Sequence, residues 1–434
     1  MSTTYDHRQT LSEPTDVNSK APRTSDHLTE SLTRLLDSTP IVCFANDWGG
    51  DPTSKHHIMR LYAGFTDVLW VESSGMRVPN LLSKSDLGRI YSKIARSQQG
   101  TTRPSGRLRV IAPLTLPFPA SRLARRANGL LLERAISRTG FSSPPPILWV
   151  YTPTVAPYLD AFPHTSIVYH CVDRWWEFGE FDPALMREFH ESLCTRATVT
   201  FASSQELLLD CQPHTPRAHL MRHGVDWEHF AAAVHNPPPE PDDISDIEGP
   251  ILGFFGLIHD WIDQELLVAL ARAFPESTLV LLGKTRVDVS RLQGVPNIRL
   301  LGQKRYEDLP AYAARFDVGL VPFVVNELTL AVNPIKLREY LSAGVPVVST
   351  ALPEMLVYGH RDDVRVAGGH AEFIEGVGEL LRRTGSADRR QRLAEDMRGE
   401  SWLGRCESMI RLWHDQRRTS QGATPPSGRT TQTG

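Results

Sequence analysis

The sequence predicts an α/β protein built from two doubly wound, Rossmann-like domains that face a central cleft. Short apolar runs alternate with segments of helical period along most of the chain, and a proline-rich stretch interrupts the alternation near its middle. Strands that alternate with helices form parallel sheets covered by helices. The prolines within residues 235–250 can continue neither a helix nor a central strand, so the boundary between the domains is expected there.

The N-terminal half is expected to contain an arm and one domain. Residues 1–30 are polar, with few large apolar side chains, and are predicted to be a disordered arm. The domain is expected to span residues 31–235. Its predicted strands are residues 41–45, 68–71, 108–111, 147–151, 167–170 and 198–201, and its predicted helices are residues 54–64, 122–137 and 183–195.

The C-terminal half repeats the alternation after a linker at residues 236–249. The second domain is expected to span residues 250–419, and residues 420–434 are expected to form a disordered tail. The predicted strands are residues 251–255, 278–282, 298–301, 318–321 and 345–349. The predicted helices are residues 262–274, 306–315 and 334–343, followed by two more that reach about residue 416.

The composition is that of a folded protein without a strong charge bias. The chain has 434 residues, 41% of them hydrophobic and 22% charged, with a net charge of -3, so no overall field attracts nucleic acid. The five cysteines are odd in number and lack a Cys-x-x-Cys pair, which argues against a disulfide framework or a structural zinc site. We therefore expect a cytoplasmic protein with no metal and no cofactor other than a co-substrate.

The most informative segment begins at Asn333. Pro334 suits the first turn of a helix, whose free backbone N–H groups form a natural site for phosphate oxygens. Lys336 adds a cation to that helix start, where it opposes the helix dipole unless an anion is bound. Glu339 follows about one turn later, and its carboxylate suits two neighbouring hydroxyls, such as those of a ribose. The alternative is a solvated Lys336–Glu339 pair on a helix surface.

The run from Glu339 to Ser349 resembles the nucleotide-binding motif of retaining glycosyltransferases of family 4, the group 1 family with the GT-B fold. Further stretches resemble the same family in the same order and extend the resemblance over most of residues 40–415. They are Phe201-Ala-Ser-Ser204, His223-Gly-Val-Asp-Trp-Glu-His-Phe230, Gly253-Phe-Phe-Gly256 and Asp317-Val-Gly-Leu-Val-Pro322.

The resemblance implies that the C-terminal domain binds a nucleoside-diphosphate sugar, with Glu339 on the ribose and Lys336 on the diphosphate. Two family positions differ: Ala331 replaces the first motif glutamate, with Glu327 nearby, and Leu257 replaces a common arginine, with Lys284 or His259 as helpers. The full donor-binding set expected is Asn333, Pro334, Lys336, Glu339, Gly256, Lys284, Gln303, Arg305 and Glu327.

Two polar segments of the N-terminal half are candidates for the acceptor side. Gly49 and Gly50 form a turn after a strand, and Asp51, His56 and His57 follow it, where they are expected to hold acceptor hydroxyls. This position matches the glycine-rich acceptor loop of the resembled family. A tight turn with an N-capping side chain is the alternative.

The second segment follows the strand predicted at 167–170. His170 and Asp173 leave that strand toward the cleft, where they are well placed to contact the reacting sugar or acceptor. A core histidine is the alternative for His170. Trp175 and Trp176 suit stacking on a sugar or isoprenoid, although tryptophan is also common in cores. Asp173, His170 and Asp51 are the catalytic candidates.

Residues 84–138 contain twelve Lys and Arg against two acidic residues, with leucines at helical spacing. This pattern is typical of an amphipathic helix on anionic lipid, and we expect the protein to lie peripherally on the inner face of the cell membrane. An ordinary solvated face is the alternative. A nucleic-acid partner is not expected, because no nucleic-acid module is recognised.

The predicted function is sugar transfer from a nucleoside-diphosphate sugar to a lipid-linked, polysaccharide or other glycan acceptor, in cell-envelope or exopolysaccharide biosynthesis. The resemblance implies retention of the anomeric configuration. Inverting transfer with Asp51, His170 or Asp173 as general base remains an alternative. A sugar-nucleotide epimerase or a non-catalytic carbohydrate-binding paralogue is an alternative of another class, because Ala331 and Leu257 depart from the family pattern.

Overall fold

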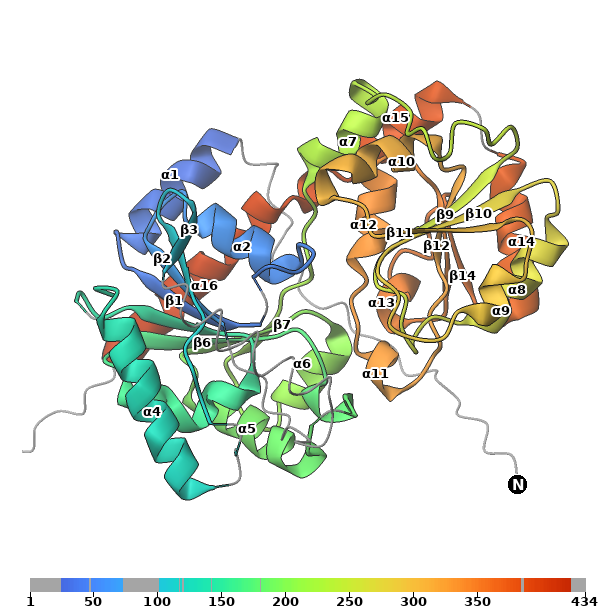
Figure 1. The fold of residues 1–434 in the computed structure, drawn as a ribbon. Coiled ribbons are helices and arrows are strands. Elements are labelled where there is room, and N and C mark those ends of the chain that lie inside the picture. Colours follow the sequence, from blue (N-terminus) through green and yellow to red (C-terminus); the bar gives the residue numbers. More distant parts are fainter. Residues whose placement is uncertain are drawn as a thin grey trace, which may run out of the picture.

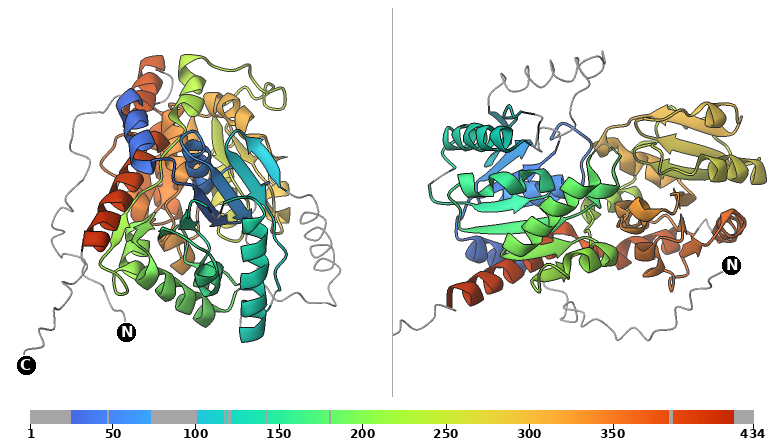
Figure 2. Two further views of the ribbon diagram at one scale, coloured as in Figure 1. Left: turned by 90° about the vertical axis from the view of Figure 1, so that its left-hand side faces the viewer. Right: turned by 90° about the horizontal axis from the view of Figure 1, so that it is seen from below.

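Each half of the chain folds around its own parallel sheet (Figure 1). The structure is a computed structural model that describes residues 25–422 except 47, 73–100, 117, 119–120, 142, 180 and 384–385. Helices cover both faces of each sheet, as the two further views show (Figure 2). The predicted α/β class with two doubly wound domains is confirmed.

The N-terminal sheet has the strand order β3-β4-β2-β1-β5-β6-β7-β8, and its pairs are parallel except for β3 against β4. The strands are β1 Ile41–Ala45, β2 Val68–Glu72, β3 Thr102–Ser105, β4 Leu108–Ile111, β5 Ile147–Val150, β6 Ser166–Cys171, β7 Val199–Ala202 and β8 Ala218–Leu220. The helices of this half are α1 Ser25–Leu36, α2 Ser54–Tyr62, α4 Arg122–Ser137, η1 Pro153–Ala161, η2 Trp175–Glu177, α5 Pro183–Arg196 and α6 Gln205–Cys211.

The C-terminal sheet is parallel throughout, with the order β11-β10-β9-β12-β13-β14. Its strands are β9 Ile251–Phe255, β10 Thr278–Leu282, β11 Ile298–Gly302, β12 Val318–Val321, β13 Val347–Thr350 and β14 Val364–Ala367. The helices are α7 Trp227–His235, α8 Gln264–Ala273, α9 Ser290–Gln293, η3 Tyr306–Asp308, α10 Leu309–Arg315, α11 Glu327–Leu330, α12 Ile335–Ser342, α13 Pro353–Leu356, α14 His370–Leu381, α15 Ala387–Asp396, η4 Arg398–Glu400 and α16 Trp402–Gly422.

The strand order reverses direction at β9 in one sheet and at β1 in the other. Loops that leave the carboxyl ends of strands on either side of such a switch point diverge, and the crevice between them is where ligands of these folds bind. The topology therefore predicts ligand binding beyond the carboxyl ends of two strands, β9 and β1.

Most predicted elements agree with the structure. The strands predicted at 41–45, 108–111, 251–255, 278–282 and 318–321 are confirmed to the residue. The strand predicted from residue 345 begins two residues later. There the Val345 N–H donates to the Tyr340 carbonyl, and Gly344 adopts a φ of 72° to close helix α12.

The domain limits differ from those predicted because two helices pack across the expected boundaries. Helix α7, assigned by sequence to the first domain, packs its Trp227 and Phe230 into the core of the second. Helix α16 returns to the first domain (Figure 1), where it contacts α1 and α2. Its Trp402 and Trp413 join a core cluster of that domain. The disordered arm was predicted at residues 1–30, of which residues 1–24 lie outside the described residues. Its last six residues belong to helix α1, which begins at Ser25.

The chain therefore passes between the domains twice, once before α7 and once before α16. The two passages lie side by side, since the Val225 N–H donates to the Glu400 carbonyl and the Trp402 N–H donates to the Val225 carbonyl. Gly224 is required at this point, because a Cβ there would lie 2.9 Å from the backbone of Trp402.

Within the part of the chain that the structure describes, no helix combines the length and apolar character needed to cross a membrane.

Candidate active site

A groove that is open to solvent, with about 470 Å³ of empty space, lies at the carboxyl ends of β9, β10 and β11, between the two domains. The N-terminal domain contributes Asp51 and Pro52 to its wall. The C-terminal domain contributes the other lining residues, Phe255, Gly256, Leu282, Gly283, Gln303, Lys304, Tyr306, Leu309, Lys336 and Glu339. The groove lies at the switch point after β9, where the fold favours ligand binding.

Two glycines keep part of the groove wall free of side chains. Gly256 and Gly283 have φ angles of 149° and 146°, which other residues rarely adopt. A Cβ on Gly283 would lie 1.8 Å from the carbonyl oxygen of Gly256, and one on Gly256 would lie 3.1 Å from Cε of Lys336. A ligand can therefore approach the backbone closely beside the Lys336 side chain, and the donor-binding role predicted for Gly256 stays a prediction.

Lys336 and Glu339 are both groove residues, and they contact each other. Lys336 Nζ lies 3.1 Å from a Glu339 carboxylate oxygen, and it also sits 5.3 Å from the centre of the Phe255 ring. Glu339 is only 3% exposed. The alternative of a solvated pair is wrong for that reason. A buried carboxylate held by a single lysine keeps capacity to accept hydrogen bonds from a ligand.

The start of α12 also favours the binding of an anionic ligand in the groove. Pro334 is the N-cap residue and makes no side-chain cap hydrogen bond, so the first N–H groups of the helix gain no partner from it. Such N–H groups and the positive end of the helix dipole favour an anion. Lys336 belongs to this first turn, so two sources of positive potential act on one wall of the groove.

Asn333 has a different role from the one expected. Its amide Nδ2 donates to the Ser203 carbonyl at 2.7 Å and to Glu354 at 3.2 Å, while its Oδ1 accepts from Arg338 at 2.7 Å. The Asn333 side chain is buried and engaged on both ends. It therefore ties the start of α12 to the N-terminal domain instead of facing the donor.

Glu354 accepts several hydrogen bonds at this contact between the domains. It is 2% exposed and also accepts from the backbone N–H of Gln205 at 2.8 Å and from Arg222 at 2.7 Å. Nearby, the Ser204 hydroxyl donates to the Ala331 carbonyl at 2.6 Å. Ala331 thus lies buried against the first domain.

Of the remaining donor candidates, Gln303 belongs to the groove lining, whereas Lys284, Arg305 and Glu327 do not. Gln303 is part of the lining and donates to Asp51 across the two domains. Lys284 is half-buried, and Arg305 is exposed and pairs with Glu307 at 3.3 Å. Glu327 is exposed and pairs with Arg174 of the first domain at 3.3 Å.

An aromatic wall that the sequence analysis did not identify closes one side of the groove. His229 stacks on the groove residue Tyr306, with ring centres 4.5 Å apart, and His57 lies 5.4 Å from Tyr306 on the other domain. The Tyr306 hydroxyl is buried and has no hydrogen-bond partner among the described residues, and burial together with the charge of Glu339 raises the pKa of Tyr306. The available signal in the sequence was a tyrosine four residues after Gly302, at the start of the segment that follows the strand.

His57 also packs within the first domain. Its ring stacks on Trp402 of α16 at 5.6 Å, and burial beside Arg60 lowers the pKa of His57 to about 3. His56, in contrast, points into the first domain, where its Nδ1 caps α2 at Thr53 and its ring packs on Trp70. His56 is therefore a capping and core residue, as the tight-turn alternative proposed, and not an acceptor ligand.

His170 lies near the carboxyl end of β6 in the N-terminal sheet. His170 is 1% exposed and stacks on Tyr151 at 5.0 Å, while both of its ring nitrogens lack a hydrogen-bond partner among the described residues. Burial lowers the pKa of His170 to about 3, and the nearby charge of Lys55 contributes. A neutral imidazole with such a low pKa is a weak general base at neutral pH.

Asp173 follows on the same loop and differs in its electrostatics. Burial raises the pKa of Asp173 to about 6, against the opposing charge of Lys55. The loop faces the C-terminal domain, since the next residue, Arg174, donates to the Glu327 carbonyl at 3.1 Å. A carboxyl group with a pKa near neutrality is suited to proton transfer or to charge stabilisation in a reaction.

Lys55 is a further functional candidate, which was not predicted from the sequence. It lies in the first turn of α2, is 8% exposed, and donates from Nζ to Asn46 after β1. Its charge acts on both His170 and Asp173. The signal in the sequence was a lysine at the beginning of a helix that follows a glycine-rich turn.

The other residues predicted for the acceptor side have mixed outcomes. Gly49 is exposed and Gly50 half-buried in the turn after β1, as expected. Trp175 packs on Phe178 and Phe181, and Trp176 packs on His190. Both tryptophans belong to the hydrophobic core, so the core alternative for them is correct.

Helix α4 lies at the outer side of the N-terminal domain (Figure 2), and several of its leucine and arginine side chains are exposed. Leu123 and Leu130 are 78% and 67% exposed, and Arg126 and Arg134 are exposed at matching helical spacing. The preceding segment is fixed to α4, because Asn128 exchanges two hydrogen bonds with the backbone of Leu116. Residues 84, 89, 93 and 96 of the basic region lie outside the described residues.

Comparisons with known proteins agree with this architecture. Residues 249–383 match the family described as glycosyl transferases group 1. A stretch of 278 residues is 26% identical to a Bacillus subtilis (strain 168) protein that bears the name teichuronic acid biosynthesis glycosyltransferase TuaH, covering 59% of this chain and 68% of that protein. The family match includes β9 to β13, α12 and the groove residues of the second domain.

Solved structures share the two-domain arrangement. Sucrose-phosphate synthase from Thermosynechococcus elongatus aligns with a TM-score of 0.63 and 14% identity, over 89% of this chain and 100% of that one. Anabaena HepE in complex with UDP-glucose aligns with a TM-score of 0.56 and 15% identity, over 89% and 100%. The chain has the GT-B fold, as the sequence resemblance implied.

Proposed function

We propose that this chain, a glycosyltransferase with a group 1 C-terminal domain, transfers a sugar with retention from a nucleoside-diphosphate donor to a lipid-linked or polysaccharide acceptor of the cell envelope. The observation that carries the proposal is the pairing of Lys336 with the buried carboxylate of Glu339 in a groove between the domains. The two charges suit the two ends of a nucleoside diphosphate.

In the proposed complex, the diphosphate lies at the start of α12. Lys336 turns from Glu339 to the phosphate oxygens, and the bare backbone at Gly256 lets the phosphates approach. The released Glu339 carboxylate accepts hydrogen bonds from the ribose hydroxyls. Tyr306 lies in the same groove and supplies an aromatic face for the base. Preorganised positive charge stabilises the leaving diphosphate as negative charge develops on it.

The acceptor is proposed to enter from the N-terminal domain, toward the carboxyl end of β1. Asp173 and Lys55 provide a carboxyl group and a cation on that side. Retention is supported by the family resemblance and by the neutral state of buried His170, which makes an inverting reaction with His170 as base unfavourable. In the retaining reaction, an oxygen of the departing diphosphate accepts the acceptor proton.

A lipid-linked acceptor is supported by the exposed face of α4. Leucines that are more than half exposed, interleaved with arginines, favour binding at an anionic interface. The relative TuaH is named for teichuronic acid biosynthesis, which is consistent with a cell-envelope polymer as product.

The proposal is tested by incubating the full-length protein with a panel of nucleoside-diphosphate sugars and with lipid-linked or oligosaccharide acceptors. We expect transfer from one donor class, with a product anomer identical to that of the donor when followed by NMR. A product of opposite anomeric configuration contradicts retention and favours Asp173 as general base. Donor hydrolysis or epimerisation without transfer to any acceptor contradicts the proposal as a whole.

A further inference from the structure

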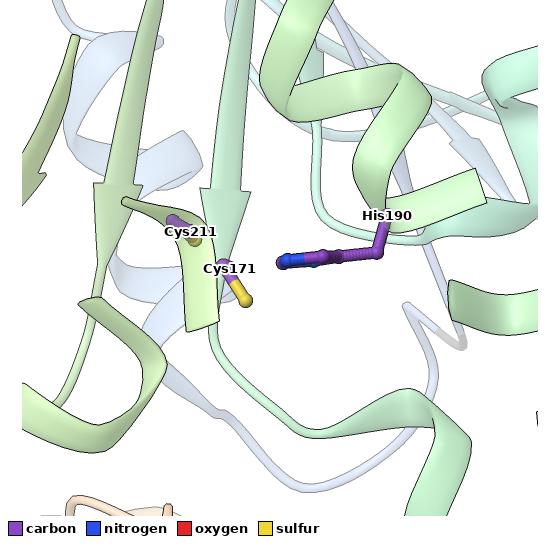
Figure 3. Close-up of side chains that lie close together, drawn as sticks. All are labelled: Cys171, His190 and Cys211. Atoms are coloured by element: carbon purple, nitrogen blue, oxygen red, sulfur yellow. The ribbon is translucent and has the colours of Figure 1, made fainter. Parts of the chain in front are cut away.

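A buried cluster of thiols and one imidazole lies beneath the acceptor-side loop. Cys171 ends β6, His190 lies in α5 and Cys211 ends α6, and their ligand atoms all lie within 4.8 Å of one another. Figure 3 shows the His190 ring directed toward Cys171 and Cys211. A further thiol, Sγ of Cys194, lies 3.6 Å from His190 Nε2.

The histidine is oriented for metal binding by a second residue. The Tyr169 hydroxyl lies 2.9 Å from His190 Nδ1, so a protonated Nδ1 that donates to this oxygen leaves the lone pair on Nε2. Nε2 faces Cys194 and also lies 3.4 Å from the carbonyl oxygen of Asp210, a long contact that a metal bond would replace. Metal-bound histidines commonly have such a partner on the second nitrogen.

The set of donors is specific for a soft, tetrahedral cation. Three cysteines with one histidine form a common structural zinc set, closed to substrate. Three of the chain's five cysteines gather at this point, although they come from three separate elements. The other two, Cys43 and Cys406, lie in a different core cluster.

We propose that Cys171, His190, Cys194 and Cys211 bind one Zn²⁺ as a structural site. Binding replaces three thiol protons, which pass to solvent, and no oxidation is involved. The sequence-based expectation of no metal rested on the missing Cys-x-x-Cys pair, and it did not consider ligands that the fold brings together from distant positions. This inference does not depend on the identity of the transferred sugar.

The site would fix the loop that carries Asp173. Cys171 directly precedes that loop, and Cys211 directly follows Asp210, whose carboxylate accepts from Arg174 at 2.8 Å. Zinc would therefore join the end of β6 to α5 and α6 and hold the Asp173–Arg174 segment against the C-terminal domain. Asp173 and Arg174 themselves would not bind the metal.

The test is the metal content of the full-length protein, purified under reducing conditions after growth with zinc and measured by mass spectrometry of the metal. We expect close to one zinc per chain, and after replacement by Co²⁺ an absorption spectrum of tetrahedral thiolate coordination. Treatment with a strong chelator should lower the thermal midpoint.

Matched cysteine variants separate this site from adventitious zinc. Cys211→Ser should lose most of the zinc, while Cys406→Ser, which alters an equally buried cysteine outside the cluster, should retain it. If Cys211→Ser fails to fold, the wild-type stoichiometry and cobalt spectrum still decide. Wild-type protein that takes up no zinc, or that yields a Cys171–Cys211 disulfide on peptide mapping, overturns the proposal.

Discussion

The donor groove and the acceptor-side residues both lie at the carboxyl ends of parallel strands, but they are built in different ways. The donor groove takes Lys336 and Glu339, the two charged residues assigned to the donor, from a single turn of α12, where they lie 3.1 Å apart. The acceptor-side residues come from three elements: Lys55 from α2, His170 from β6 and Asp173 from the loop after β6. We infer that the first site depends on local structure for binding, and that the second depends on long-range packing to adjust the pKa values of its groups.

The largest expected effect is at Asp173. If Asp173 acts on the reacting groups, Asp173→Ala should lower kcat by about 10³-fold and leave the affinity for nucleoside diphosphate unchanged. Steady-state kinetics and calorimetry measure the two quantities. Asp160→Ala, which removes an exposed carboxylate of the same domain, is the control. Loss of nucleotide affinity in Asp173→Ala would show that the two sites are not separate.

Asp173 should also affect how the stability of the folded protein depends on pH. Burial raises the folded-state pKa of Asp173 to about 6, so its contribution favours the folded state at low pH and becomes unfavourable as pH rises through about 6. At pH 8, Asp173→Asn should therefore lose activity while keeping the thermal midpoint of the wild type or exceeding it. A lower midpoint at pH 8 than the wild type would contradict the assigned pKa shift.

Lys55 should have a smaller effect, which depends on pH. Its charge lowers the pKa of Asp173, so Lys55→Met should raise that pKa and move the acidic limb of the pH profile of kcat to higher pH, by about one unit. Lys55→Arg keeps the charge and should keep the limb near its original position. An unchanged pH profile in Lys55→Met would exclude Lys55 from the acceptor-side site.

The smallest effect is expected at α4, which is distant in sequence from both sites. Leu130→Glu should weaken co-sedimentation with anionic vesicles by about tenfold, because a leucine no longer enters the interface. Leu209→Glu, at a leucine of α6 that is 50% exposed, is the matched control. Equal binding of the protein to anionic and zwitterionic vesicles would contradict an electrostatic membrane face.

The comparison also shows which features a sequence can reveal. The start of α12 was predictable because proline, lysine and glutamate act there through local helix geometry. His56 was misassigned because one residue of register decides whether a side chain of α2 meets Trp70 in the core or Tyr306 across the cleft. The zinc candidate was not predictable, because Cys171 and Cys211 become neighbours only through sheet order.

Domain limits show the same contrast. The prolines of residues 236–249 were expected to mark the boundary, yet Ile244 is buried in the core of the C-terminal domain and Asp243 bonds to Lys304. The apolar faces of α7 and α16, which include Phe230 and Trp413, decide the true domain membership of these helices. Those faces indicate burial but do not indicate which core receives them.

The most direct test of the account is calorimetric titration with a panel of nucleoside diphosphates. For the diphosphate that the wild-type protein binds, Glu339→Ala should raise the Kd by roughly 100-fold, the loss expected for two hydrogen bonds to a carboxylate. Arg305→Ala, at a residue that lies outside the groove lining, should leave the Kd unchanged. Unchanged affinity in Glu339→Ala would contradict the placement of the donor nucleotide at the start of α12.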